Sequence, residues 1–414
     1  MEHEGIFRMW LERKPIFKNR EYLRPTYTPE RLPHREEQIH QLARILVAPL
    51  RGETPSNIFI YGKTGTGKTA TVKYVIKELE KVGKELQRRV EGIYVNCEMV
   101  NTRYRVLATL VNCLVGGDRG ARGVPMTGWP TDAVYDCFLR SLDSTERVVV
   151  IVMDEVDRLV AKNGDDVLYD LTRINSELRS TKVSVIGISN DARFTTYLDP
   201  RVKSSLGEEE IVFPPYNAIQ LKDILEQRAS EAFNPRVLGE GVIQLCAAHA
   251  AREHGDARRA LDLLRVAGEL AERDNTGMVT VEHVRRAYEK VEQDKMMELI
   301  RTLPSQSKLV LYSVLLLTEK GRNRITTGEV YEAYRRICRS GGVDVLTPRR
   351  VSDLISELDM LGVISTQLIS SGRYGRTKEI VLNISPVQLR AALQEDDSIS
   401  TIDVLTLPRQ LTLM

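Results

Sequence analysis

One short segment narrows what this chain can fold into more than any other. Residues 62–69 read Gly-Lys-Thr-Gly-Thr-Gly-Lys-Thr and fit the pattern GxxxxGK[ST]. A β-branched and aromatic run, Asn57–Tyr61, precedes the segment, and a helical pattern over Ala70–Leu79 follows it. In that context the glycines let backbone N–H groups surround phosphate oxygens at the positive end of a helix. We therefore predict a phosphate-binding loop between a strand and a helix.

The residue types in this loop suggest separate roles. Lys68 is expected to pair with the outer phosphates of a nucleoside triphosphate, and Thr69 to bind Mg²⁺. The ligand expected here is ATP or ADP. The predicted binding residues of the loop are Thr64, Gly65, Thr66, Gly67, Lys68 and Thr69.

A second segment ends in two acids. The run Val148–Met153 has the composition of a buried strand, and Asp154 and Glu155 follow it directly. Acids at the carboxyl end of a parallel strand face the crevice in which ligands bind. We expect Asp154 to hold Mg²⁺ through its water shell and Glu155 to polarise the attacking water.

Strand-like and helix-like segments alternate from Leu32 to about Tyr216. The expected strands are Asn57–Tyr61, Gly92–Asn96, Val148–Met153 and Val183–Ser189. Short buried strands separated by helices predict an α/β fold with a parallel sheet. We assign residues 31–216 to this sheet domain and residues 1–30, which carry three prolines, to a loosely held N-terminal arm.

The rest of the chain has a different pattern. Residues 217–295 look wholly helical and predict a small lid domain. Residues 300–386 show three helical patterns and then two short strands around a Gly-rich turn, which is the layout of a winged helix. This C-terminal third is basic, since residues 301–385 hold 13 Lys and Arg against 8 Asp and Glu. An excess of +5 favours an anionic partner. Residues 387–414 are left as a tail without assigned structure.

Composition excludes several classes of protein. The chain has 414 residues, of which 42% are hydrophobic and 28% charged, as in ordinary globular domains. Apolar runs are too short to span a membrane, so no membrane partner is expected. The five cysteines are scattered and never spaced CxxC, which favours a reducing compartment without a zinc site. We expect a cytoplasmic protein.

With Asn190 after the fourth strand, these motifs resemble those of the AAA+ ATPases. The resemblance implies that Asn190 positions the lytic water. The segment Gly255–Leu261 looks like the lid arginine motif, so Arg258 is expected to reach the γ-phosphate in cis while Arg259 faces solvent. Arg201 occupies the place where AAA+ subunits offer an arginine to a neighbouring ATP. Alternative roles remain open, including an Asx turn for Asn190 and a local ion pair for Arg201.

The combination of motifs is more specific than AAA+ alone. The Pro33-His34-Arg35 segment, the lid arginine and the winged helix together resemble the archaeal replication initiators of the origin-recognition and helicase-loader family, over about residues 15–385. The resemblance implies that Pro33, His34, Arg35 and Tyr216 lie at the bound nucleotide. A capping role for His34 remains an alternative.

The same resemblance points to DNA-facing elements. Leu110–Asp132 occupies the position of an initiator-specific insertion and carries Arg119 and Arg122. Arginines beside apolar wedges suit entry into a groove, although a surface loop remains an alternative. In the winged helix, one helical face can enter the major groove, and the hairpin tip suits phosphates and the minor groove. The candidate residues there are Arg349, Arg350 and Ser352 on the helix and Arg373, Tyr374 and Arg376 at the tip.

The resemblance implies an initiator that binds duplex origin DNA and is therefore associated with the chromosome. It further implies that the protein assembles with other copies or paralogues and helps to load the replicative helicase. Its ATP hydrolysis should be slow in isolation. A winged-helix transcriptional regulator built on the same ATPase is the main alternative. A protein remodeller is a third, but the aromatic-hydrophobic-glycine pore loop that it requires is not evident in the sequence.

Overall fold

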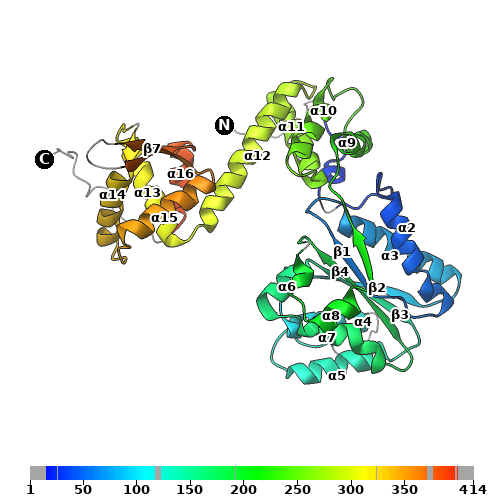
Figure 1. The fold of residues 1–414 in the computed structure, drawn as a ribbon. Coiled ribbons are helices and arrows are strands. Elements are labelled where there is room, and N and C mark those ends of the chain that lie inside the picture. The colour runs from blue at the N-terminus through cyan, green and yellow to red at the C-terminus, as the bar shows by residue number, and fades with distance from the viewer. Residues whose placement is uncertain are drawn as a thin grey trace, which may run out of the picture. The chain divides into compact units, whose positions relative to one another are not determined.

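The computed structural model describes residues 15–25, 27–116, 123–191, 193–322, 324–370, 376–396 and 399. The chain divides into two compact units, Met1–Ala287 and Tyr288–Met414. Figure 1 shows a sheet with flanking helices and a helical lid in the first unit, and a smaller mixed domain in the second. Within the described residues, no helix is both long and apolar enough to cross a membrane.

The first unit is organised around a parallel sheet. Its five strands run in the order β2-β3-β4-β1-β5, and each neighbouring pair is parallel. The four expected strands are confirmed, and their bounds are β1 Ile58–Tyr61, β2 Val90–Asn96, β3 Val148–Asp154 and β4 Lys182–Ser189. The fifth, β5 (Glu209–Val212), was not expected. It is an edge strand in which only Ile211 is buried, so it lacks the apolar run of its neighbours.

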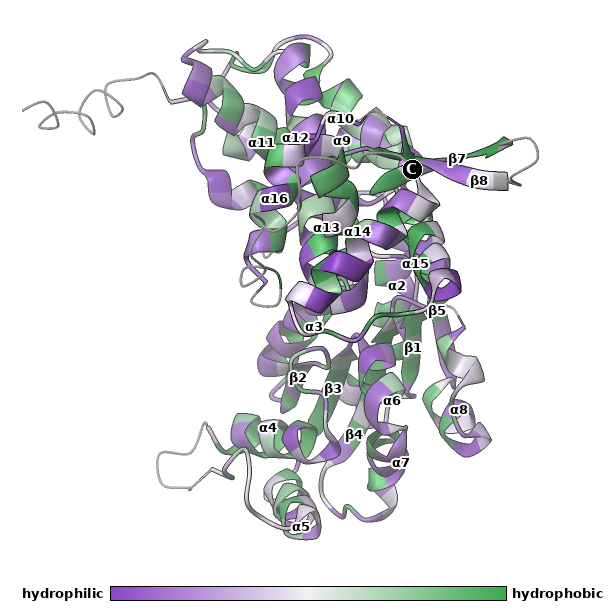
Figure 2. Ribbon diagram, turned by 90° about the vertical axis from the view of Figure 1, so that its left-hand side faces the viewer, coloured by the Kyte–Doolittle hydropathy of each residue, from purple (hydrophilic) through white to green (hydrophobic). Residues whose placement is uncertain are grey.

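Both faces of the sheet are covered. Along β3, Val149 and Ile151 enter one core and Val150 and Val152 enter the opposite one. A strand buried on both sides must be apolar at every position, which is why this run reads as continuous hydrophobic sequence. In Figure 2, β1 and β3 are coloured largely as hydrophobic. The first core also contains residues of α4 Arg103–Val115, α5 Thr131–Leu142, α6 Val156–Asn163, α7 Asp166–Arg173 and α8 Pro200–Leu206; the second contains α2 Glu36–Ile45 and α3 Lys68–Glu85.

The lid is formed by α9 Ala218–Ala232, α10 Val242–Arg252 and α11 Ala257–Asp274. A capping box at Asn217 begins α9 and so marks where the sheet domain ends. Short 3₁₀ turns also occur in this unit, at η1 Arg20–Leu23, η2 Ala48–Arg51, η3 Ile174–Ser176 and η4 Phe194–Thr196.

The expectation of a loosely held N-terminal arm is wrong for its described part. Ile16 and Leu23 are almost fully buried. The Phe17 ring packs on that of Phe233 at 4.8 Å, and the N–H groups of Lys18 and Asn19 donate to the Ala232 carbonyl. Prolines and polar residues suggested a mobile segment, but its few apolar side chains are enough to dock it on the lid.

The second unit is a winged helix, as expected. Helix α12 (Val281–Thr302) begins in the first unit and ends in the second. Helices α13 Ser305–Glu319, α14 Thr327–Ser340 and α15 Pro348–Met360 follow, with the antiparallel strands β6 Ile325–Thr326, β7 Ile364–Ser370 and β8 Arg376–Leu382. The β7–β8 hairpin extends away from the helices of its unit (Figure 2).

One further helix was missed. Helix α16 (Pro386–Gln394) lies beyond the boundary expected at residue 386, in the part interpreted as a tail. Its Leu389 and Leu393 are fully buried in the core around α13. The helix therefore completes the hydrophobic core of the winged-helix unit.

Candidate nucleotide site and DNA-facing elements

The predicted phosphate loop connects β1 to α3. Gly65 and Gly67 have positive φ values of 68° and 87°, a region that residues with a Cβ rarely adopt. Gly67 also caps α3, so the helix begins at Lys68. The loop therefore has the sharp turn and the adjoining helix N-terminus that phosphate binding requires.

Lys68 is buried inside this loop. Its ammonium donates to the Gly62 and Lys63 carbonyls at 2.7 and 2.8 Å and to Asn190 Oδ1 at 2.8 Å. The pKa of Lys68 is lowered to about 8, chiefly by burial; Asp154 opposes this shift and the nearby Arg258 adds to it. Asn190, directly after β4, and Lys68, at the start of α3, are thus in direct contact.

Asp154 lies beside the start of α3. The Thr69 hydroxyl donates to Asp154 Oδ2 at 2.7 Å, and the Tyr94 hydroxyl donates to the same oxygen. Burial and Asp154 together raise the pKa of Tyr94 above its usual range. Tyr94 was not predicted from the sequence, because a tyrosine in the second strand carries no motif.

Glu155 follows Asp154 in an unusual conformation. Its φ is 56°, in the left-handed region, and its N–H donates to Asp154 Oδ1 at 3.0 Å. Burial raises the pKa of Glu155, and the neighbouring Glu98 adds to the effect. A turned backbone at a strand end places two consecutive acids toward one cavity.

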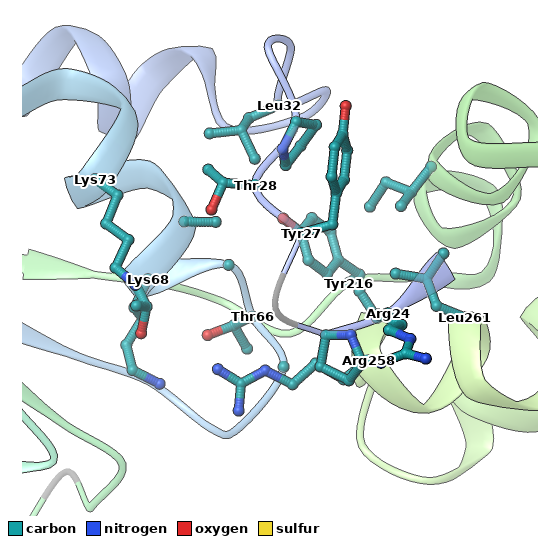
Figure 3. Close-up of a pocket in the computed structure, with 18 of the residues that line it drawn as sticks. Arg24, Tyr27, Thr28, Leu32, Thr66, Lys68, Lys73, Tyr216, Arg258 and Leu261 are labelled. Atoms are coloured by element: carbon teal, nitrogen blue, oxygen red, sulfur yellow. The ribbon is translucent and has the colours of Figure 1, made fainter. Parts of the chain in front are cut away.

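The lid contributes Arg258. Asp256 caps α11 by accepting from the Arg258 and Arg259 N–H groups, and the Ala257 N–H donates to the Gly65 carbonyl at 3.1 Å. Figure 3 shows Arg258 reaching from α11 toward Lys68. Arg259 does not face solvent as expected, because it pairs with Glu253.

These groups line one cavity of about 420 Å³. Of the predicted nucleotide-site residues, the cavity wall includes Pro33, Gly65, Thr66, Gly67, Lys68, Thr69, Asp154, Glu155, Asn190, Tyr216 and Arg258. Sequence reasoning missed a second part of the wall, which comes from the N-terminal segment and the lid and includes Arg24, Tyr27, Thr28, Ile224, Arg228 and Leu261. Those residues carry no motif and come together only through the docking of distant segments.

The described cavity wall does not include His34, Arg35 or Thr64. His34 has a φ of 63°, and its Nε2 pairs with Asp223 Oδ2 at 2.8 Å. Arg35 is only 2% exposed and donates to main-chain carbonyls behind the loop. For His34 and Arg35, the structure therefore differs from the expected place in the pocket wall, because other protein groups hold both side chains. Thr64 lies exposed on the loop.

Arg201 also lies apart from this cavity. It sits in the first turn of α8, pairs with Asp199 at 3.1 Å, and lies over the Tyr169 ring at 5.4 Å. Its side chain is 64% exposed. An exposed arginine outside its own site is compatible with both a local ion pair and a role toward a neighbouring subunit.

The DNA candidates are only partly described. Arg119, Arg122, Arg373 and Tyr374 lie outside the described residues, and Arg376 is placed only as the first residue of β8. Arg349 and Arg350 are exposed in the first turn of α15, where Arg350 lies 3.8 Å from Glu357.

The polar face of α15 also contacts the hairpin. Ser352 contributes its carbonyl, which accepts from the Ser356 hydroxyl. Lys378 of β8, which was not predicted, donates to that same hydroxyl at 2.6 Å. The hairpin therefore adds a lysine to the face on which Arg349 lies.

Comparison with known proteins decides the family. The matching family descriptions are an AAA domain over residues 51–193, a Cdc6 AAA+ ATPase-type lid domain over 222–289 and a CDC6 C-terminal winged helix domain over 298–392. The ORC1-type DNA replication protein of Pyrococcus abyssi is 60% identical over 404 residues, covering 98% of this chain and 96% of that protein. The chain belongs to the ORC1-type DNA replication proteins.

Other relatives agree with this assignment. ORC1-type DNA replication protein 1 of Methanosarcina mazei is 58% identical over 395 residues, covering 95% of this chain and 94% of that protein. The structure of the Aeropyrum pernix ORC1 protein in complex with DNA matches with a TM-score of 0.76 at 48% identity, over 93% of this chain and 98% of that one. The resemblance to replication initiators and the fold of AAA+ domain, lid and winged helix are thus confirmed.

Proposed function

We propose that this ORC1-type protein is an ATP-regulated initiator that binds duplex DNA at replication origins. The observation that carries the proposal is one cavity shared by the phosphate loop, the two acids after β3 and the lid arginine. In AAA+ proteins these are the parts that bind and hydrolyse ATP. The Aeropyrum pernix relative was solved in complex with DNA, which supports DNA as the second ligand.

Each site residue has a proposed role in hydrolysis. Lys68 and the loop N–H groups bind the outer phosphates, and Glu155 polarises the attacking water, which Asn190 helps to position. Arg258 contacts the γ-phosphate in cis, whereas Arg201 acts on the ATP of a neighbouring copy. Because Arg201 lies outside its own cavity, turnover in the isolated chain should be slow.

The residues present fit Mg²⁺ beside the phosphates. The Thr69 hydroxyl and the Asp154 carboxylate can both supply oxygen ligands to a metal ion. Their oxygens lie 2.7 Å apart at the N-terminus of α3. Mg²⁺ prefers oxygen ligands and is commonly held by one or two protein groups together with substrate phosphates. When bound, the ion neutralises phosphate charge, and the chain contributes Thr69 and Asp154 to it.

The winged helix is the proposed DNA-binding unit, with α15 facing the major groove and the β7–β8 hairpin facing the backbone. The insertion with Arg119 and Arg122 is a second proposed contact. Further proposed partners are other copies or paralogues of the initiator and the replicative helicase. DNA binding of this kind implies an association with the chromosome.

Mapping the bound DNA across the genome of the source organism tests this proposal against the transcriptional regulator. We expect peaks at one or a few origins, and weaker occupancy in a Lys68→Ala strain because nucleotide binding is lost. Peaks spread over many promoters would favour the regulator. The relatives described above are replication proteins, which supports the initiator.

A further inference from the structure

Arg35 is buried behind the phosphate loop in a position that the nucleotide site does not explain. Its exposure is 2%, and it is among the largest fully buried side chains of the described chain. Burial lowers the pKa of its guanidinium, although arginine stays charged in proteins. A buried charge is costly unless hydrogen bonds replace its lost hydration, so its partners reveal what keeps it there.

Those partners are main-chain carbonyls from separate segments. Arg35 Nε donates to Thr66 of the phosphate loop at 2.9 Å. One terminal nitrogen donates to the Pro214 carbonyl at 2.7 Å, and the other to the carbonyl of the preceding residue at 3.0 Å. Pro214 belongs to residues 213–217, here called the connector, which joins β5 to the first lid helix. A single side chain thus binds both the phosphate loop and the connector.

Tyr216 extends this link to the lid. The Arg35 guanidinium lies over the Tyr216 ring at 3.7 Å, which is within the range of a cation–π contact. The Tyr216 hydroxyl is so close to Gly67 that a Cβ on that glycine would lie 2.8 Å from it. On its other side, the Tyr216 N–H donates to the Gly255 carbonyl at 3.3 Å.

The contact between Tyr216 and Gly255 lies next to the start of α11, the lid helix that carries Arg258. A Cβ on Gly255 would lie 2.2 Å from the Tyr216 carbonyl oxygen, so the backbones of the connector and the lid are in direct contact. Asp256 packs on Gly65 of the phosphate loop and caps α11, which carries Arg258. Two routes therefore connect the phosphate loop to Arg258: a direct one, in which Asp256 and Ala257 contact Gly65, and one through Arg35, the connector and the start of α11.

We propose that Arg35 is a positioning residue that couples the phosphate loop to the lid, so that a nucleotide held at the loop determines where Arg258 is placed. The inference rests on the proposed nucleotide binding at this loop. Lysine at position 35 would keep the charge, but it lacks the planar fork that reaches Thr66 and Pro214 together. Arg35→Lys should therefore weaken the coupling more than it weakens the loop.

A double-mutant cycle tests this coupling. ADP and a non-hydrolysable ATP analogue are titrated calorimetrically into the full chain, as wild type, Arg35→Lys, Arg258→Ala and the double variant. We expect Arg35→Lys to bind ADP within about a factor of two of the wild type, a difference of the order of the error in such cycles, because Arg35 is not part of the described cavity wall. Its preference for the ATP analogue over ADP should fall as in Arg258→Ala, and the double variant should lose no more than Arg258→Ala alone.

The control is Arg147→Lys, because Arg147 is also largely buried and donates to Glu91 and to the Ser141 carbonyl, outside the cavity wall. It should leave both affinities unchanged. The coupling would be overturned if the two substitutions reduced the preference for the ATP analogue over ADP independently, so that their effects multiplied in the double variant. It would also be overturned if Arg35→Lys kept the wild-type preference. A wild-type chain that bound neither nucleotide would instead refute the proposed function.

Hydrogen exchange on the wild type keeps the inference testable if Arg35→Lys does not fold. The Tyr216 N–H of the connector donates to the Gly255 carbonyl of the lid, and it should exchange more slowly when either nucleotide protects the loop. Protection of residues 62–69 without any change at Tyr216 would show that the lid does not follow the loop through the connector.

Discussion

Lys68 combines burial with a charge that the site needs. Its ammonium donates to two loop carbonyls and to Asn190, yet burial still lowers its pKa to about 8. A phosphate bound beside it would favour the charged form and raise that pKa again. Nucleotide binding and protonation of this one side chain are therefore linked.

This linkage predicts a pH dependence with a definite sign. Below the pKa of about 8 the amine is already charged, so affinity for ADP should change little with pH. Above it, binding must take up a proton, so affinity should fall by at most about tenfold per pH unit until the pKa of the complex is reached. Calorimetry in two buffers of different ionisation enthalpy should detect this proton uptake. Affinity that rose with pH above about 8 would contradict the assignment.

Lys68 and Glu155 should serve different steps, ATP binding and ATP hydrolysis respectively. Lys68→Ala should abolish ATP binding, because the charge beside the outer phosphates is lost. Glu155→Gln should retain binding and lose hydrolysis, since the amide cannot polarise the attacking water. Filter binding and phosphate release measure the two steps separately. An equal loss of nucleotide affinity in both variants would refute the division of roles.

At the scale of elements, α15 and the hairpin present DNA-facing groups on supports of different stiffness. Helix α15 is anchored by Val351, Leu354, Ile355 and Leu358, all buried in the core of the winged helix. A helix held in this way can direct the side chain of Arg349 at a base edge. Arg376 begins a strand of the projecting hairpin, where we expect it to contact the DNA backbone and not to read bases.

Arg349→Ala and Arg376→Ala should therefore change DNA binding differently. Loss of a base contact should cost about 1–3 kcal/mol on the recognised site and much less on random duplex. Loss of a phosphate contact should weaken both duplexes and lower the slope of log K against log salt by about 0.9. Fluorescence anisotropy at several salt concentrations separates these outcomes. The roles would be reversed if Arg376→Ala alone removed sequence preference, and unchanged binding in both variants would exclude this surface.

Helix α16 should contribute to the stability of the winged-helix unit. Leu389→Ala removes a fully buried side chain and should cost about 2–5 kcal/mol, the usual range for leucine in a core. Val387→Ala on the same helix is the matched control, because Val387 is 79% exposed. In calorimetric melting of the full chain, only Leu389→Ala should lower the midpoint temperature of an unfolding transition. Equal melting curves would mean that α16 is not part of this core.

For the whole molecule, the location of Arg201 makes activity depend on assembly. This side chain is exposed on α8, where it pairs with Asp199 and lies over the Tyr169 ring, while the cavity of its own chain already has Arg258. Arginine fingers supplied in trans are worth about 10³–10⁵ in rate where they have been measured. A chain that lacks this contribution as a monomer should hydrolyse ATP slowly.

We accordingly expect slow turnover in dilute solution and no effect of Arg201→Ala there. At high chain concentration, or on DNA, copies can assemble. Turnover should then rise in the wild type and not in Arg201→Ala. Arg193→Ala, which removes another exposed arginine of the same domain, is the control. Phosphate release measured across a range of chain concentrations provides the comparison. Turnover of tens per second in a dilute monomer, unchanged by Arg201→Ala, would contradict this role, because it would exceed the median enzyme turnover of about 10 per second.

Local patterns in the sequence were sufficient for strands β1 to β4 of the sheet, the phosphate loop and the acid pair. A strand buried on both faces must be apolar throughout, as in Val148–Met153, and a phosphate loop needs glycines next to a lysine, as in 62–69. Periodicity likewise located α13, α14 and α15, because each buries one or more faces in a single core. These constraints act between residues close in the chain, so the sequence alone expresses them.

Only the tertiary structure decided what surrounds the nucleotide cavity. Tyr27 reaches the wall because Phe17 docks on Phe233, more than 200 residues away in the chain. Arg35 belongs to a motif that pointed to the ligand, yet carbonyls of the loop and the connector hold it behind the cavity. Polar β5 and α16 were missed because an edge strand or a short helix needs few apolar residues. Contacts of this kind depend on how distant segments pack, and short-range patterns do not record them.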